Sequence, residues 1–134
     1  MGGDGYAMES GSPTFYSTMD YNAYRRNEPD RFLKWTNHNG AVGRYKSIEE
    51  FFKATGLEEH GILADYDIFV NARPSEKGRT CESGDYDLRL KKNANVVDAG
   101  IVLPQITEDF TGKAPDLGCY ELGQEPPHYG PRGF

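Results

Sequence analysis

The 134-residue chain is short of basic residues and of long apolar runs. It has 15 Lys and Arg against 21 Asp and Glu, which gives a net charge of −6. Binding to nucleic acid phosphates requires clustered Lys and Arg, so this balance argues against a nucleic acid partner. No apolar run approaches the roughly 20 residues that span a bilayer, which argues against a membrane partner. The first residues lack the basic start and apolar stretch of a signal peptide, and they leave open whether Met1 is a true start.

Cysteine is scarce as well, with Cys81 and Cys119 as the only two. They allow either a single disulfide or two unrelated thiols, and the sequence leaves both open. There is no Cys-x-x-Cys pair and no Cys/His spacing that suits zinc. We therefore expect no cofactor, apart from the calcium considered below.

What the chain does have is turns and aromatic rings. It contains 16 Gly, 8 Pro and 13% aromatic residues, with apolar residues at 37%. This mixture predicts short elements joined by many turns. Large aromatic side chains have little reason to stay in water, so we expect a single domain with an aromatic core.

One helix is well marked, from Ser47 to Thr55. Ser47 and Glu50 form a capping box, in which the serine oxygen accepts the Glu50 amide and the glutamate reaches back. Gly56 follows where a left-handed C-cap glycine is expected. Apolar positions recur with helical spacing and predict one buried stripe, made of Ile48, Phe51, Phe52 and Thr55.

Short strand candidates surround this helix. They are the ranges 14–19, 32–35, 62–64, 68–70 and 85–90, bounded by turn residues. The apolar members of the best-patterned segments form the predicted core, which is Trp35, Phe51, Phe52, Ile62, Phe69 and Leu88. The last ten residues contain Pro126, Pro127 and Pro131, which predict an extended tail rather than a helix.

Several motifs, taken in order, resemble the C-terminal part of bacterial right-handed parallel β-helix proteins of the pectate-lyase-like superfamily. The matching stretches are 20–24 (DYNAY), 32–35 (FLKW), 45–56, 59–62 (EHGI), 65–71 (DYDIFVN), 85–90 (DYDLRL), 97–100 (VDAG), 109–112 (DFTG) and 115–121 (PDLGCYE). Together they fall within residues 14–132. Each piece alone is weak, but the set in this order is specific.

The resemblance implies a mainly β fold: the terminal coils of a right-handed parallel β-helix, one short amphipathic helix and an irregular C-terminal cap. Residues 1–134 would form a single segment. In it, 1–44 would be late coils and a loop, 45–56 the helix, and 57–134 the terminal strands, the cap and the Pro-rich tail. The resemblance also implies a secreted or cell-surface protein whose upstream β-helix coils are the chain's intramolecular partner.

Three functions follow from this resemblance. The first is a structural one, a C-terminal cap of a secreted β-helix protein that binds or degrades polysaccharide, with no catalytic residue in this chain. The second is part of a polysaccharide lyase or glycoside hydrolase whose catalytic coils lie upstream, and the third is a small carbohydrate-binding module. We expect the isolated chain not to cleave pectin or alginate, because a cleft of that kind needs several stacked coils. The polysaccharide, the parent's reaction and the oligomeric state stay open.

Two sets of residues are candidates for a site. An aromatic platform for sugar rings could be built from Tyr21, Tyr24, Trp35 and Tyr45, although their spacing fits core packing equally well. The carboxylates of Asp65 and Asp67 could bind calcium, with the capping of turn amides as the alternative.

Three further polar residues are predicted to be structural. His60 precedes an apolar run, which favours a hydrogen-bonding role over catalysis. Asp98 precedes a small residue and glycine, and Asp116 precedes a leucine and glycine, as aspartates that cap turns do.

Overall fold

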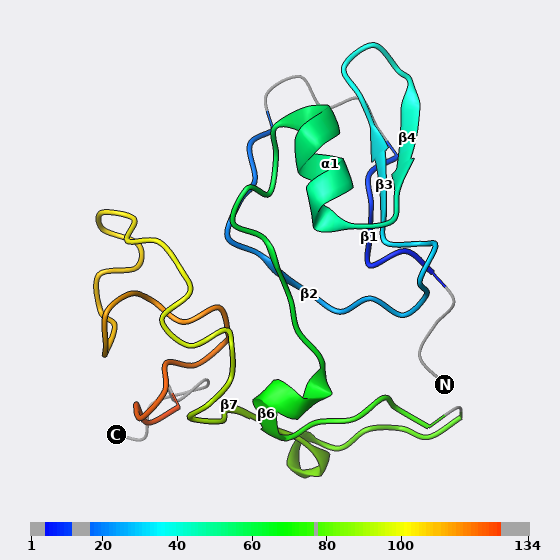
Figure 1. The fold of residues 1–134 in the computed structure, drawn as a ribbon. Helices are drawn as coiled ribbons and strands as arrows, with labels where there is room; N and C mark the ends of the chain where they lie inside the picture. Colours follow the sequence, from blue (N-terminus) through cyan, green and yellow to red (C-terminus); the bar gives the residue numbers. More distant parts are fainter. Residues whose placement is uncertain (1–4, 12–16, 77, 127–134) are drawn as a thin grey trace, which may run out of the picture.

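Short strands in small sheets make up most of the regular structure (Figure 1). The computed structural model describes residues 5–11, 17–76 and 78–126. Within these ranges, β1 (Met8–Glu9), β3 (Leu33–Thr36) and β4 (Val42–Tyr45) form one sheet in the order β1-β3-β4. β2 (Ala23–Tyr24) pairs with β5 (Ile62–Leu63), and β6 (Phe69–Asn71) pairs with β7 (Asp87–Leu90). One α-helix, α1 (Ile48–Thr55), and two 3₁₀ turns, Tyr66–Ile68 and Ser83–Asp85, complete the set.

The strand pairs differ in direction. β1 pairs with β3 and β2 with β5 in parallel, whereas β3–β4 and β6–β7 are antiparallel. The chain therefore passes through β1 and β2 and then returns, placing β3 beside β1 and β5 beside β2. Between β3 and β4 it reverses in a tight turn, in which the amide of Asn37 donates to the Ala41 carbonyl at 2.8 Å and Gly40 adopts a φ of 80°.

The predicted parallel β-helix is wrong for this chain. The described residues form separate mixed sheets of two or three strands, and each parallel pair joins only two residues of each strand. A solenoid requires several stacked parallel repeats. Here the tight turn after β3 makes a local hairpin, and β7 also adds antiparallel to its predecessor. Residues 91–126 contain turns and no strand.

The predicted helix is confirmed, with a small change at its start. Ser47 is the N-cap, and its hydroxyl accepts the amide of Glu50 at 3.2 Å. The Glu50 carboxylate accepts the amide of Lys46 at 2.7 Å instead of that of Ser47. At the other end, Gly56 has a φ of 72° and its amide donates to the Phe52 carbonyl at 2.7 Å. Both ends thus satisfy backbone groups that a short helix leaves open.

Replacing Ser47 with Ala is expected to lower the free energy of unfolding by about 1 kcal/mol, because the Glu50 amide loses its acceptor. Urea denaturation followed by circular dichroism measures the change. Ser47→Thr is the matched control, since threonine keeps the hydroxyl and should retain most of the stability. Equal stabilities for Ser47→Ala and the wild type would contradict the assigned cap.

The apolar face of α1 is narrower than its sequence predicts. Phe51 is fully buried, whereas Phe52 is 37% exposed, so its predicted burial is wrong. Ile48 and Phe51 are the buried residues of the helix. The first core cluster consists of Phe32, Leu33, Trp35, Ile48 and Phe51. It lies where α1 covers the β1-β3-β4 sheet (Figure 1).

A second core cluster, made of Ile68, Leu90 and Val96, lies beside the β6–β7 pair. Ile62 and Phe69 are half-buried against it, as partly buried members of the predicted core. The predicted burial of Leu88 is wrong, because this side chain is 41% exposed. The register between β6 and β7 shifts between Phe69 and Asn71, and this irregularity disrupts the expected alternation.

The remaining predictions concern the strand at 14–19, the Pro-rich tail, the two cysteines and a membrane-spanning segment. The predicted strand at 14–19 and the tail from Pro127 lie largely outside the described residues. Cys81 and Cys119 are both free and exposed, so they form no disulfide in this structure. Among the described residues, no helix has the length and apolar character needed to cross a membrane.

Candidate functional site

Three of the four aromatic residues proposed for a sugar platform pack into the interior. The rings of Trp35 and Tyr45 meet Phe51 edge-on, with centroids 5.7 and 5.2 Å apart. The ring of Tyr24 meets Phe32 edge-on at 5.6 Å. This geometry is the one that aromatic pairs favour in cores. The structure therefore gathers these three rings around the first core cluster.

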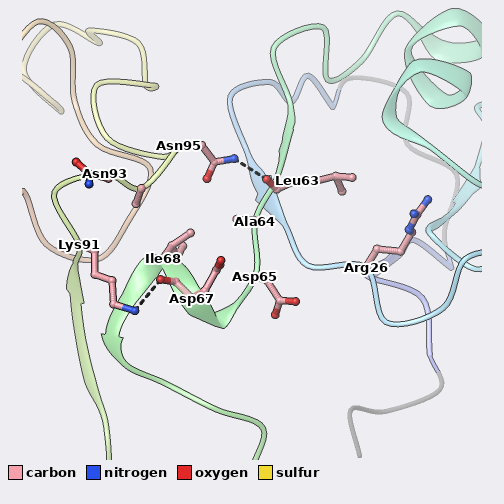
Figure 2. Close-up of a pocket in the computed structure, with 10 residues that line it drawn as sticks. Arg26, Leu63, Ala64, Asp65, Asp67, Ile68, Lys91, Asn93 and Asn95 are labelled. Atoms are coloured by element: carbon pink, nitrogen blue, oxygen red, sulfur yellow. Dashed lines mark hydrogen bonds between the residues drawn. The ribbon is translucent and has the colours of Figure 1, made fainter.

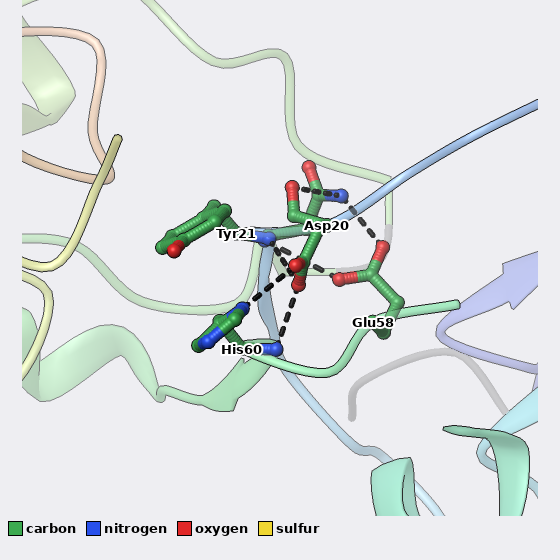
Figure 3. A network of polar contacts seen from close by, with 5 residues as sticks. Asp20, Tyr21, Glu58 and His60 are labelled. Atoms are coloured by element: carbon green, nitrogen blue, oxygen red, sulfur yellow. Dashed lines mark hydrogen bonds and ion pairs between the residues drawn. The ribbon is translucent and has the colours of Figure 1, made fainter. Parts of the chain in front are cut away.

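Tyr21 lies apart from the other three. Its ring stacks on the ring of His60, with centroids 4.6 Å apart and planes 11° from parallel (Figure 3). Tyr21 is half-buried and His60 is exposed. The structure does not bring the four rings onto one platform, and their role in sugar binding stays a prediction.

Asp65 precedes the 3₁₀ turn Tyr66–Ile68 that follows β5, and Asp67 lies within that turn. Asp65 caps this turn by accepting the Tyr66 amide at 2.7 Å, and it also accepts a bond from Arg25 Nε at 2.7 Å. The Tyr66 amide and then Arg25 hold the pKa of Asp65 below its usual range. Arg25 in turn lies 4.5 Å above the ring of Tyr66. Asp65 thus acts as a turn cap.

No metal centre is formed by the described part of the chain. In it, no group of three or more His, Cys, Asp and Glu side chains is placed to hold a metal ion. Asp67 contributes its main-chain carbonyl, which accepts Lys91 Nζ at 3.0 Å. Calcium binding by Asp65 and Asp67 stays a prediction.

The most connected polar group is the pair of Asp20 and His60 (Figure 3). One carboxylate oxygen of Asp20 lies 2.7 Å from His60 Nδ1. The other oxygen accepts the amides of His60 at 2.7 Å and of Tyr21 at 2.9 Å. This pair joins the residues before β2 to the residues before β5, as the predicted structural role of His60 requires.

A buried glutamate supports the same junction. Glu58 is fully buried and has a φ of 61°. Its Oε1 accepts Asn22 Nδ2 at 2.6 Å and the Tyr24 hydroxyl at 2.7 Å. Burial raises the pKa of Tyr24, and the bond to Glu58 raises it further. A Cβ at Gly61 would lie 2.9 Å from Glu58 Oε2, so any larger residue there would have to displace the Glu58 side chain.

No sequence pattern indicates that Glu58 is buried. It precedes Glu59, and two adjacent glutamates in a loop are usually both solvated. Only the nearby donors, Asn22 and Tyr24, explain why one of the two is inside.

The Asp20–His60 pair should make stability depend on pH. Its hydrogen bond to Asp20 raises the pKa of His60, so this contribution is complete below about pH 6.5 and is lost as the pH rises through the folded-state pKa. Burial raises the pKa of Asp20, but the bonds from His60 and Tyr21 outweigh it and the net shift is downward. This second contribution is present above about pH 4 and is lost at lower pH.

We therefore expect the pair to stabilise the fold most between about pH 4 and pH 6.5. Asp20→Asn keeps the shape and one acceptor oxygen but removes the charge. In this variant, the pKa of His60 followed by NMR should fall towards its ordinary value, and the loss of stability should be greatest in that pH window. Identical His60 titration curves in the two proteins would rule the pair out.

A cleft of about 610 Å³ lies between β5 and the segment 91–95 (Figure 2). Its lining comes from Arg26 after β2, from β5 and the residues that follow it, from the 3₁₀ turn and from the residues after β7. Asn95 joins the two sides of the cleft, with its Nδ2 donating to the Leu63 carbonyl at 2.7 Å. The lining residues are Arg26, Leu63, Ala64, Asp65, Asp67, Ile68, Lys91, Asn93, Ala94 and Asn95.

The two predicted turn aspartates bind main-chain amides near the C-terminal end of the described chain. Asp98 Oδ1 accepts the amide of Lys113 at 2.7 Å. The carboxylate of Asp116 accepts the amides of Asp98 at 2.8 Å and of Leu122 at 2.7 Å. Both carboxylates therefore accept main-chain amides as turn-capping aspartates do, but they join the segment at Asp98 to the segment at 113–116 instead of capping only their own turns.

No protein family, curated protein or solved structure matches this chain, so its function has to be inferred from its own residues.

Proposed function

We propose that this chain is a structural terminal segment of a larger, secreted protein associated with polysaccharide. In this proposal it has no catalytic role. A preceding part of the parent chain adds parallel strands to the free edges of β1 and β2, and this chain closes the assembly on the other side.

The observation that carries the proposal is the shortness of the two parallel pairs. In the β2–β5 pair, the amides of Ile62 and Ala64 donate to the carbonyls of Asn22 and Tyr24, both at 2.9 Å. Parallel sheets are nearly always covered on both faces, and isolated two-stranded sheets are marginal in water. A parallel pair of two residues per strand is therefore expected to be part of a wider sheet.

The order of the strands indicates where a further strand would add. β1 is an edge strand of its sheet, and β2 has β5 on one side only among the described residues. Both belong to the first pass of the chain, and β3 and β5 belong to the second. A strand from the preceding part of the parent chain would therefore pair at the outer edge of β1 or of β2.

Strand edges that stay unpaired promote aggregation, because they offer free backbone groups to another chain. A partner strand supplied by the parent chain removes that liability. The association with polysaccharide is supported by the resemblance of the motifs to the C-terminal parts of pectate-lyase-like proteins, and by no feature of the strands.

Hydrogen exchange tests the docking directly. The carbonyls of Asn22 and Tyr24 face β5, so the amide of Ala23, between them, faces the free edge. We expect this amide to exchange fast in the isolated chain, and Ile62 and Ala64 to exchange more slowly. In a longer polypeptide that includes the preceding part of the parent, the Ala23 amide should be protected at least tenfold more. An Ala23 amide that gains no protection there would refute the docking.

A further inference from the structure

A short apolar loop after residue 100 is exposed to solvent. The side chains of Ile101, Val102 and Leu103 are 44%, 46% and 43% exposed, and that of Ile106 is 76% exposed. Single exposed aliphatic side chains are ordinary, but four of them within six positions form a patch of the kind that binds a partner. The loop, residues 101–106, lies in the yellow part of the ribbon at the margin of the molecule (Figure 1).

Thr107 holds this apolar loop in one shape. Its Oγ1 donates to the carbonyl of Ile101 at 3.0 Å and accepts the amide of Leu103 at 2.8 Å. The Leu103 carbonyl accepts the amides of Ile106 and Thr107, both at 3.0 Å. These bonds keep the exposed aliphatic side chains together on one turn. Docking a loop that is already ordered costs little conformational entropy.

The surroundings of the apolar loop are acidic. Between Lys92 and Lys113 the sequence contains no Lys or Arg, and Glu108 and Asp109 follow Thr107 directly. Both of these acidic residues are exposed. A partner should therefore offer an apolar surface with positive charge beside it. The same charges argue against the anionic surface of a membrane.

The cleft between β5 and the segment 91–95 has an apolar surface of this kind. Aliphatic side chains from both of its sides contribute to the lining, and that of Leu63 is 46% exposed. The aliphatic lining residues are Leu63, Ala64, Ile68 and Ala94.

The same cleft also carries positive charge. Arg26 and Lys91 line it from opposite sides (Figure 2). Each donates to a neutral main-chain carbonyl, at 3.2 and 3.0 Å, so neither bond compensates the charge. Of the two carboxylates in the lining, that of Asp65 is paired with Arg25 at 2.7 Å. Apart from this pair, the lining holds two cations and the single carboxylate of Asp67.

We infer that the apolar loop of one molecule docks into this cleft on a second copy of the chain, with Glu108 and Asp109 beside Arg26 and Lys91. The inference goes beyond the proposed function and needs no added strand at β1 or β2. Because the contact joins two different surfaces, it either closes as a reciprocal pair or continues as a chain of molecules. One loop in a cleft of about 610 Å³ is a small contact, so the association should be weak and reversible.

Sedimentation velocity of the whole chain, between about 10 μM and about 1 mM, measures this association. We expect the mean mass of the wild type to rise with concentration. Ile106→Ser removes apolar contact and Lys91→Glu reverses a charge of the cleft, so each should weaken the association at least tenfold. Val42→Ser and Lys53→Glu change exposed positions outside the loop and the cleft, and these matched controls should leave it unchanged.

A mixture of the two variants gives a readout that loss of folding would not produce. Ile106→Ser keeps an intact cleft and Lys91→Glu keeps an intact loop. An equimolar mixture can therefore form one intact contact for each pair of molecules, and we expect it to stop at a dimer. A mixture that stays monomeric at about 1 mM would overturn the inference. Undiminished association of Lys91→Glu alone would do the same, because it would mean that loop packs against loop.

Two further outcomes would assign the surfaces differently. Association that neither variant weakens, with slower exchange of the Ala23 amide at high concentration, would mean that strand edges join the copies. A wild type that stays monomeric but binds phosphatidylcholine vesicles, in a manner that Ile106→Ser abolishes, would assign the apolar loop to a lipid surface. Either result would overturn docking into the cleft.

Discussion

Truncating Phe51 to Ala is expected to lower the free energy of unfolding by about 3–5 kcal/mol. Phe51 is fully buried in the first core cluster. Its ring is the one that both Trp35 and Tyr45 meet edge-on. The truncation therefore removes buried apolar area, opens a cavity and ends two aromatic contacts. Because α1 is too short to persist alone, the docking of this ring also decides whether the helix forms.

The matched control is Phe52→Ala, one position along the same helix. The Phe52 side chain is 37% exposed, so its truncation should cost about 1 kcal/mol. Equilibrium urea denaturation of the two variants compares the same chemical change at two depths. A larger loss for Phe52 than for Phe51 would mean that the helix is rotated from its position here.

This pair of residues shows how far the sequence predicts the helix. Ser47 and Gly56 mark its ends through local chemistry, so both ends are predicted to within a residue. The side that faces the core depends on where β3 and β4 lie, and that is not local. Spacing alone puts Phe51 and Phe52 on the same stripe, and packing against Trp35 then selects one of them.

For the sheets, too, the sequence predicts local structure but not which segments lie together. The apolar stretches that contain β3, β5 and β6 are visible in the sequence as short runs of strand-forming residues. Their partners are not visible, because pairing is set by distant segments and by turns. The resemblance predicts late coils and a loop for residues 1–44, whereas the chain after β3 turns back at once into an antiparallel hairpin with β4. The resemblance predicts parallel pairing throughout, but the β3–β4 and β6–β7 pairs are antiparallel and the predicted architecture is wrong.

The sequence also predicts only part of the polar contacts, because most of them join distant segments. The residue type of Asp98 and Asp116 predicts that they accept main-chain amides, but most of the amides they accept belong to a segment 15 to 18 positions away. Asp20 and His60 lie 40 positions apart, and their contact depends on the β2–β5 pairing. Glu58 is buried by that same pairing, so no local pattern could separate it from Glu59.

Replacing Glu58 with Ala is the second change for which we expect a large effect, a loss of about 3 kcal/mol. The substitution leaves Asn22 Nδ2 and the Tyr24 hydroxyl without their acceptor, and an unpaired buried donor costs about 1–3 kcal/mol. The backbone contribution largely cancels, because Ala and Glu are both strained at the φ of 61°. Glu58→Gly would also relieve that strain and so offset part of the loss, which makes it a poor test substitution here.

Glu59→Ala is the control, because Glu59 is exposed and its removal should change stability by no more than about 0.5 kcal/mol. Two adjacent glutamates are then compared at the same net charge, so a difference between the variants reports burial and bonding alone. A second readout is the pKa of Tyr24, which burial and the Glu58 bond both raise. In Glu58→Ala this pKa should fall, while burial keeps it above the ordinary value of a tyrosine. Equal losses of stability in the two variants, with an unchanged Tyr24 pKa, would show that Glu58 does not hold β2 and β5 together.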